Sequence, residues 1–178
     1  MRLEGKGVSA PNYAEAIGLL MIASDRGVPQ SHHQLGLAYE YGLGASQDFE
    51  KAIAFYIKGT EQHDVESAYH LALVYTYGRP GSETARQDYK KALALFESAS
   101  IRNHAPSTYY MGIFKLYGYG CQPNYPIAIN WFERAAGMDD EHVSGKARAA
   151  ADELRNMYHA ALEKNENIVD KYRRMGER

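Results

Sequence analysis

The same pattern of residues recurs about every 36 positions, and this repetition constrains the fold more than any other feature of the chain. A tyrosine followed by a glycine occurs at Tyr41-Gly42, Tyr77-Gly78 and Tyr117-Gly118. An aromatic residue and, three positions later, an alanine also recur; the alanines are Ala16, Ala52, Ala92 and Ala128, which lie 36, 40 and 36 residues apart. Because one such unit cannot bury its apolar face alone, the copies are expected to stack into an array.

Each unit is predicted to contain two helices, here called A and B. An A helix, such as Ser31–Tyr41, ends at a glycine that can take the positive φ of a helix C-terminus. A B helix begins at an Asn or Asp that can cap free N–H groups; these residues are Asn12, Asp48, Asp88 and Asn124. B helices carry an apolar stripe at i, i+3, i+4 and i+7, and no useful β-type alternation occurs. The predicted fold is all-α, a right-handed α-α superhelix or solenoid.

Two further features of the repeat concern the contacts between helices and the length of one loop. Glycine or alanine at one position of each helix is expected to let paired helices approach closely; these residues are Gly36, Ala72 and Gly112 in A helices and Ala52, Ala92 and Ala128 in B helices. The segment between Gly78 and Asp88 is four residues longer than its counterpart between Gly42 and Asp48. We interpret this difference as a loop insertion between two intact helices.

The chain of 178 residues is expected to form a single repeat domain, 1–178. Residues 1–30 are a partial repeat, whose B helix at about 12–26 lacks its A partner. Complete repeats are predicted at 31–66, 67–106 and 107–142, and capping helices at 143–178. The first cap helix is expected from about Ser144 to Leu162. The second contains Ile168, Val169, Tyr172 and Met175, with a frayed tail as the alternative.

Two stretches of the sequence resemble a known repeat. Residues 44–58 with 67–75, and again 124–136, are similar to the Sel-one-like repeat (SLR) family, a relative of the tetratricopeptide repeat. The resemblance covers about residues 5–140 and recurs in phase. It implies a protein–protein interaction module that acts as an adaptor, a scaffold or an inhibitor. In bacterial members it also implies an immunity protein that neutralises a cognate toxin.

Composition and motifs argue against several other functions. The 20 Lys and Arg and 22 Asp and Glu give a net charge of −2 without a basic block, so neither nucleic acid nor a membrane is expected as a partner. No phosphate-binding loop, dinucleotide fingerprint or nucleophile elbow occurs, so no enzyme, catalytic residue or cofactor is predicted. The first residues lack a signal peptide, which leaves the cytoplasm, or the periplasm after removal of a preceding signal, as the compartment.

The histidines and one acidic loop are the remaining candidates for metal chemistry. His32 and His33 are adjacent and point about 100° apart on a helix, and His70 is expected to approach them from the next repeat. Because no carboxylate or cysteine stands at a matching spacing, we expect surface or interface histidines and no metal site. The loop Asp139-Asp140-Glu141-His142 is expected to cap the following helix.

The resemblance to the Sel-one-like repeat implies that the A helices line the concave face, and we expect this face to bind the partner protein. Equivalent positions form columns on this face, and we select two of them; the predicted partner-binding residues are Gln34, Tyr41, His70, Tyr77, Tyr110 and Tyr117. Packing of the tyrosines between neighbouring repeats is the alternative. A competing function is assembly, in which the open N-terminal end docks another domain or forms an oligomer. A metal-dependent enzyme ranks below both.

Overall fold

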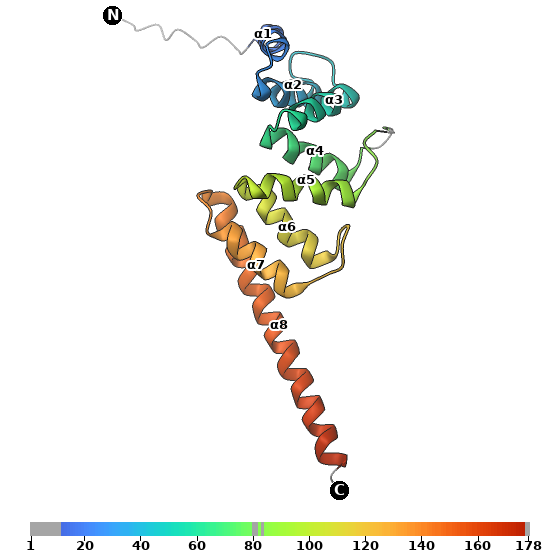
Figure 1. Ribbon diagram of the computed structural model, residues 1–178, viewed down its shortest axis with the longest axis vertical. Helices are drawn as coiled ribbons and strands as arrows, with labels where there is room; N and C mark the ends of the chain where they lie inside the picture. Colours follow the sequence, from blue (N-terminus) through green and yellow to red (C-terminus); the bar gives the residue numbers. More distant parts are fainter. Residues whose placement is uncertain (1–11, 80–81, 83, 177–178) are drawn as a thin grey trace, which may run out of the picture. The chain divides into compact units, whose positions relative to one another are not determined.

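The chain forms a succession of helices, as the repeat predicts (Figure 1). The computed structural model describes residues 12–79, 82 and 84–176. The helices in these residues are α1 (Tyr13–Asp25), α2 (Pro29–Tyr41), α3 (Phe49–Glu61), α4 (Val65–Tyr77), α5 (Tyr89–Ile101), α6 (Ala105–Tyr117), α7 (Tyr125–Ala136) and α8 (Glu141–Gly176). No strand occurs in the part of the chain that the structure describes. The predicted all-α class is therefore confirmed.

Both helix boundaries of the repeat have the predicted chemistry. Asp48 Oδ1 accepts a hydrogen bond from the backbone N–H of Lys51 at 3.0 Å, and Asn124 Oδ1 accepts one from Ile127 at 3.0 Å. The side chains of Asn12 and Asp88 cap α1 and α5 in the same way. At the ends of the A helices, Gly42, Gly78 and Gly118 have φ values of 70°, 66° and 74°. The repeat thus places a helix start and a helix stop at fixed positions.

The fold divides into two compact units. The first unit contains Met1–Leu71 and Arg79–Arg86, and the second contains Ala72–Gly78 and Gln87–Arg178. The division falls inside α4, so that the single domain expected over residues 1–178 stays a prediction.

In the first unit, the core lies where α2 packs on α3. Tyr56 is fully buried, and its ring lies against Gly36 of α2, where a β-carbon would overlap it. Leu35 is also fully buried, and Ala52 and Ile53 are nearly so. The predicted apolar stripe of the B helix therefore faces the A helix, and the glycine permits their close approach.

The second unit repeats this arrangement with α6, α7 and α8. Phe132 of α7 lies against Gly112 of α6, as Tyr56 lies against Gly36. Ala128, Ile129, Phe132, Ala151 and Leu154 form one buried cluster, and Ala105, Ala135, Val143 and Ala147 form another. The first turns of α8 thus complete the core that α6 and α7 begin.

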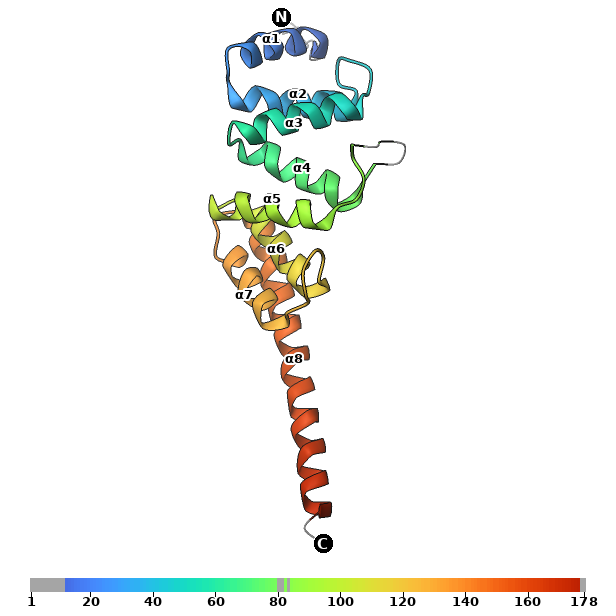
Figure 2. The same cartoon turned by 45° about the vertical axis from the view of Figure 1, so that its right-hand side comes forward.

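The C-terminal segment differs from the prediction. A single helix, α8, runs from Glu141 to Gly176 in place of the two expected cap helices. Figure 2 shows its C-terminal half continuing past α6 and α7. The stretch Lys164-Asn165-Glu166-Asn167, at which a break was expected, contains neither proline nor glycine and can continue a helix.

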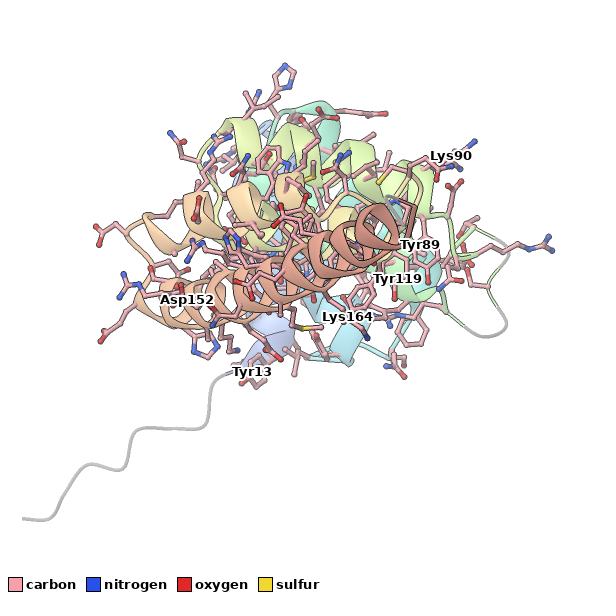
Figure 3. All side chains as sticks on the ribbon, turned by 90° about the horizontal axis from the view of Figure 1, so that it is seen from below. Tyr13, Tyr89, Lys90, Tyr119, Asp152 and Lys164 are labelled. Carbon is pink, nitrogen blue, oxygen red and sulfur yellow. The ribbon has the colours of Figure 1, made fainter. Side chains whose placement is uncertain are left out.

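The second glycine of the Tyr-Gly-x-Gly sequence has a packing role that the sequence did not reveal. A β-carbon on Gly120 would lie 2.6 Å from the carbonyl oxygen of Tyr89, and Gly120 has a φ of 68°. The rings of Tyr119 and Tyr89 stack beside it with their centroids 4.5 Å apart (Figure 3). The loop after α6 is thereby held against the start of α5.

The N-terminal partial repeat is described only in part. Helix α1 matches the B helix predicted for about residues 12–26. Its expected lack of an A partner concerns residues 1–11, which lie outside the described residues. None of the described helices combines the length and the apolar character needed to cross a membrane.

Candidate partner-binding surface

The three predicted tyrosines occupy the last position of their A helices and point their side chains toward solvent. Tyr41, Tyr77 and Tyr117 are 62%, 63% and 62% exposed. Side chains this exposed are not core residues, so none of the three tyrosines is packed in the core. Their role in binding stays a prediction.

The other three predicted residues differ in exposure. Gln34 is exposed, whereas His70 and Tyr110 are half-buried. The ring of Tyr110 stacks on Phe96 at 4.7 Å, and its hydroxyl lies 3.2 Å from that of Tyr77. The ring of His70 stacks on Tyr56 at 5.4 Å. The structure therefore pairs Tyr77 with Tyr110, and gives Tyr110 and His70 supporting contacts with buried aromatic rings.

An apolar groove of about 710 Å³ lies in the second unit. Its walls come from α6, α7 and α8; the lining residues are Tyr109, Ile113, Leu116, Tyr117, Tyr125, Phe132, Ala150, Glu153, Leu154, Met157, Tyr158 and Ala161. Tyr117 is the one predicted binding residue among them. Glu153 is the one charged residue of the lining, so the groove offers apolar area with a single carboxylate.

The contribution of α8 to this groove was not foreseen. In the sequence, Leu154, Met157, Tyr158 and Ala161 stand at helical spacing, which indicates one apolar face of the predicted cap helix and no groove. Leu154 is indeed buried, but Met157 is 63% exposed. The sequence feature that could have indicated the groove is the length of this apolar face. It extends beyond the turns of α8 in which Ala147 and Ala151 are buried. Ile113 of α6, which is not among the predicted binding residues, also lines the groove.

The three histidines considered for metal binding, His32, His33 and His70, lie in two environments. His32 is buried, and its Nε2 lies 3.1 Å from Ser24 Oγ. His33 and His70 lie with their ring centroids 4.9 Å apart, and Glu66 joins them. Burial lowers the pKa of His33, against the carboxylates of Glu66 and Asp64, which raise it. The expectation that no carboxylate stands at a matching spacing was wrong, because Glu66 lies four residues before His70 on the same face of α4.

The acidic loop before α8 acts as a helix cap. Asp140 Oδ1 accepts a hydrogen bond from the backbone N–H of Val143 at 3.0 Å. His142 lies beside Lys146, with 2.7 Å between their nitrogen atoms. The expectation that this loop caps the next helix is confirmed at Asp140.

The profile of the Sel1 repeat matches four consecutive segments, residues 1–28, 29–64, 65–104 and 105–140. The chain belongs to the Sel1 repeat family. Three of the four matches begin at the first residue of an A helix, namely Pro29, Val65 and Ala105. Sel1 repeats generally mediate protein–protein interactions, and the family is typically a non-catalytic scaffold for them.

Solved structures support the same fold. A Sel1 repeat protein from Oxalobacter formigenes is 30% identical, with a TM-score of 0.66 over 74% of this chain. The match covers 52% of the Oxalobacter protein, so this Sel1 repeat chain spans about half of its length. Cysteine-rich protein B from Helicobacter pylori is 20% identical, with a TM-score of 0.53 over 79% of this chain and 98% of that one. No curated protein sequence matches the chain.

An immunity protein, Pa5087 from Pseudomonas aeruginosa, is a more distant match. It is 14% identical, with a TM-score of 0.39 over 84% of this chain and 77% of that one. A similarity of this size carries no argument about function.

Proposed function

We propose that this Sel1 repeat protein binds an apolar helical segment of another protein in the groove between α6 and α8. The observation that carries the proposal is the groove itself, which combines about 710 Å³ of volume with a mostly apolar lining. Concave apolar sites of this size are typical of binding pockets, and amphipathic helices commonly insert their apolar face into such grooves.

Two exposed side chains define the area available to a partner. Tyr117 lies at the end of α6, and Met157 lies on α8. Both remain largely exposed in the isolated chain, so a partner can remove their apolar surface from water. Tyrosine also supplies a hydroxyl for hydrogen bonding, and methionine adapts to irregular surfaces. Because Glu153 is the charged residue of the lining, a lysine or arginine beside the partner's apolar face would complement it.

The biological role that fits such binding is that of an adaptor, a scaffold or an inhibitor. An immunity-type inhibitor, which neutralises a cognate bacterial toxin, is one form of this role. The support is the interaction function of the Sel1 family together with the groove. Copurification of the protein with the products of neighbouring genes would distinguish a toxin partner from other partners.

The binding proposal is tested with the double variant Tyr117→Ala/Met157→Ala. The full chain is immobilised, proteins are captured from a lysate of the native source and identified by mass spectrometry, and the affinity of a captured protein is then measured by calorimetry. Exposed aromatic anchors of an interface typically contribute about 1–2 kcal/mol or more each, so affinity should fall at least about tenfold.

The matched control is Ile101→Ala, because Ile101 is 69% exposed in the same unit but does not line the groove. This variant should retain the affinity of the unmodified chain. Circular dichroism should show unchanged helicity for both variants. If the captured protein binds the groove variant as tightly as the control, the groove is not the binding site.

Assembly through α1 is a second candidate function, favoured by the surface of that helix. No residue of α1 is buried, and Leu19 and Ile22 are 64% and 50% exposed. An apolar helix face of this kind can bind a second chain or another domain. Light scattering over a range of protein concentrations tests self-assembly through α1. The double variant Leu19→Glu/Ile22→Glu should abolish any dimer that the unmodified chain forms. An unmodified chain that stays monomeric at all concentrations would contradict self-assembly.

A further inference from the structure

Two histidines and one glutamate converge in the first unit, on the side of the A helices. His33 lies on α2, and Glu66 and His70 lie on α4. One ring nitrogen of each histidine and one carboxylate oxygen of Glu66 all lie within 4.8 Å of one another. Glu66 and His70 share a face of α4 because residues four apart are neighbours on a helix.

The surrounding packing holds His70 in place. The ring of His70 stacks on Tyr56 at 5.4 Å, and the ring of Tyr69 meets it edge-on at 5.3 Å. Tyr56 is itself fully buried, and its hydroxyl donates a hydrogen bond to Glu40 at 2.7 Å. A site whose side chains are fixed by such packing loses little entropy when it binds a ligand.

His33 carries a second signal. Its Nε2 atom is buried but makes no hydrogen bond. Buried polar atoms in proteins almost always have a partner, and one without a partner calls for a physical reason. A metal ion coordinated by this nitrogen would supply the missing partner.

The stacking of the repeats does not depend on the residue types of this cluster. The residues of the other A helices that correspond to His70 are Gln34 and Tyr110, and those that correspond to His33 are Tyr69 and Tyr109. Neither set could bind a metal in the same way. Packing of the repeats therefore proceeds without these three side chains, and their combination occurs once in the described A helices.

We propose that His33, Glu66 and His70 bind a zinc ion. Two imidazoles and one carboxylate are a donor set that suits zinc, whereas calcium and magnesium prefer oxygen ligands throughout. Zinc–ligand bonds of about 2.0–2.2 Å in a tetrahedron place donor atoms roughly 3.4 Å apart, so the three side chains must move closer together when zinc binds. Three protein ligands leave a fourth position, which water or a side chain of a bound protein can fill.

Titration of the purified, metal-free full chain with zinc chloride in an isothermal calorimeter tests the proposal. We expect one equivalent of zinc to bind and the thermal unfolding midpoint to rise with zinc. Replacing one ligand, in Glu66→Gln or in His70→Gln, should weaken binding by more than about 100-fold, because loss of outer-shell partners alone costs 10–100-fold. Cobalt, used in place of zinc, should give visible absorption bands that the same variants lose.

His159→Gln and Glu61→Gln are the matched controls, because both residues are exposed and lie outside the cluster. They should bind zinc as the unmodified chain does. Glu66 is exposed, so Glu66→Gln is expected to fold even if His70→Gln does not. The proposal is overturned if the unmodified chain binds no zinc below about 1 mM, an affinity of only about 4 kcal/mol, or if the ligand variants bind as tightly as the controls.

Discussion

At the scale of single residues, a buried carboxylate ties three parts of the first unit together. Glu40 of α2 is 5% exposed. Its Oε2 accepts a hydrogen bond from the hydroxyl of Tyr56, and its Oε1 pairs with the guanidinium of Arg79. A charge can remain buried only when such partners compensate it. Burial, together with the neighbouring Glu40 carboxylate, raises the pKa of Tyr56 far above its usual value, so that the hydroxyl stays a donor.

Removal of the Tyr56 hydroxyl should therefore destabilise the protein. Hydrogen bonds to charged groups contribute about 1.5–3 kcal/mol, and we expect Tyr56→Phe to lower the free energy of unfolding by that amount in urea titrations. Tyr41→Phe is the control, because Tyr41 is largely exposed. Equal losses in the two variants would show that the bond to Glu40 contributes nothing specific.

In two helix pairs, α2 with α3 and α6 with α7, a glycine sets how closely the helices approach. In Gly112→Ala, the new β-carbon would lie 2.5 Å from two ring atoms of Phe132, which is buried. Overpacking of a core costs about 1–3 kcal/mol, so the thermal midpoint should fall. Gly145→Ala is the control, since nothing lies within 4 Å of its new carbon, and it should rise in stability by about 0.5–1 kcal/mol through helix propensity. A higher midpoint in Gly112→Ala would contradict this account.

At the scale of elements, the four-residue loop insertion is anchored at several points. Besides Arg79, which pairs with Glu40, Ser82 Oγ donates a hydrogen bond to Glu50 at 2.5 Å, and Thr84 Oγ1 donates another. The backbone N–H of Arg79 also bonds to the carbonyl of Ala85, which is fully buried. Arg79, Ser82 and Thr84 of the insertion therefore bind α2 and α3 within the first unit.

The hydroxyls of Ser82 and Thr84 lower the pKa of the Glu50 carboxyl below its usual 4.5, and the Ser82 hydroxyl has the larger effect. The stabilisation that they provide is complete above pH 4.5 and is lost as the pH falls through the lowered value. Ser82→Ala/Thr84→Ala should raise the pKa of Glu50 back toward 4.5, as measured by NMR titration of its carboxyl carbon. Ser46→Ala, in the exposed loop after α2, should leave this pKa unchanged. An unaltered pKa in the double variant would mean that the hydroxyls do not bind Glu50 in solution.

Helix α8 has two parts with different roles. Its first turns bury Val143, Ala147 and Ala151 against α6 and α7, whereas residues 159–166 are exposed. Stability should therefore depend on position along one continuous helix.

Ala151→Asp places a carboxylate in a buried cluster and should cost several kcal/mol or raise the pKa of the new group. Ala160→Asp, on the exposed part of the same helix, should change stability by no more than about 0.5 kcal/mol. Thermal unfolding followed by circular dichroism measures both. Similar losses at the two positions would indicate that the whole of α8 is packed.

At the scale of the whole molecule, stability is expected to be local. In a repeat array each element contacts mainly its neighbours. Within the first unit α1 contacts α2 and α2 contacts α3, and within the second α5 contacts α6, α6 contacts α7 and α7 contacts α8. Elements with little buried surface should open first.

Hydrogen exchange should reveal this gradient. Helix α1 has no buried residue, so its amides should exchange faster than those of α6, which buries Met111 and Phe114. Mass spectrometry of peptides after exchange measures the order. Protection of α1 equal to that of α6 in dilute, monomeric protein would contradict the expectation.

The repeat itself was legible in the sequence because its signals are local. A cap at Asp48 or Asn124, a terminating glycine at Gly42 or Gly118 and an apolar stripe three and four residues apart depend on neighbours within one or two turns. Helix type and helix order follow from such signals without knowledge of the tertiary structure.

What only the tertiary structure decided are contacts between residues far apart in the chain. The pairing of Arg79 with Glu40, the meeting of His33 with Glu66 and His70, and the apolar groove between α6 and α8 each require the positions of two or more helices. Spacing within one helix cannot predict which side chain of another helix it faces, because that depends on how deeply the helices pack and at what angle they cross. The sequence alone therefore determined the repeated helices, and packing determined the sites between them.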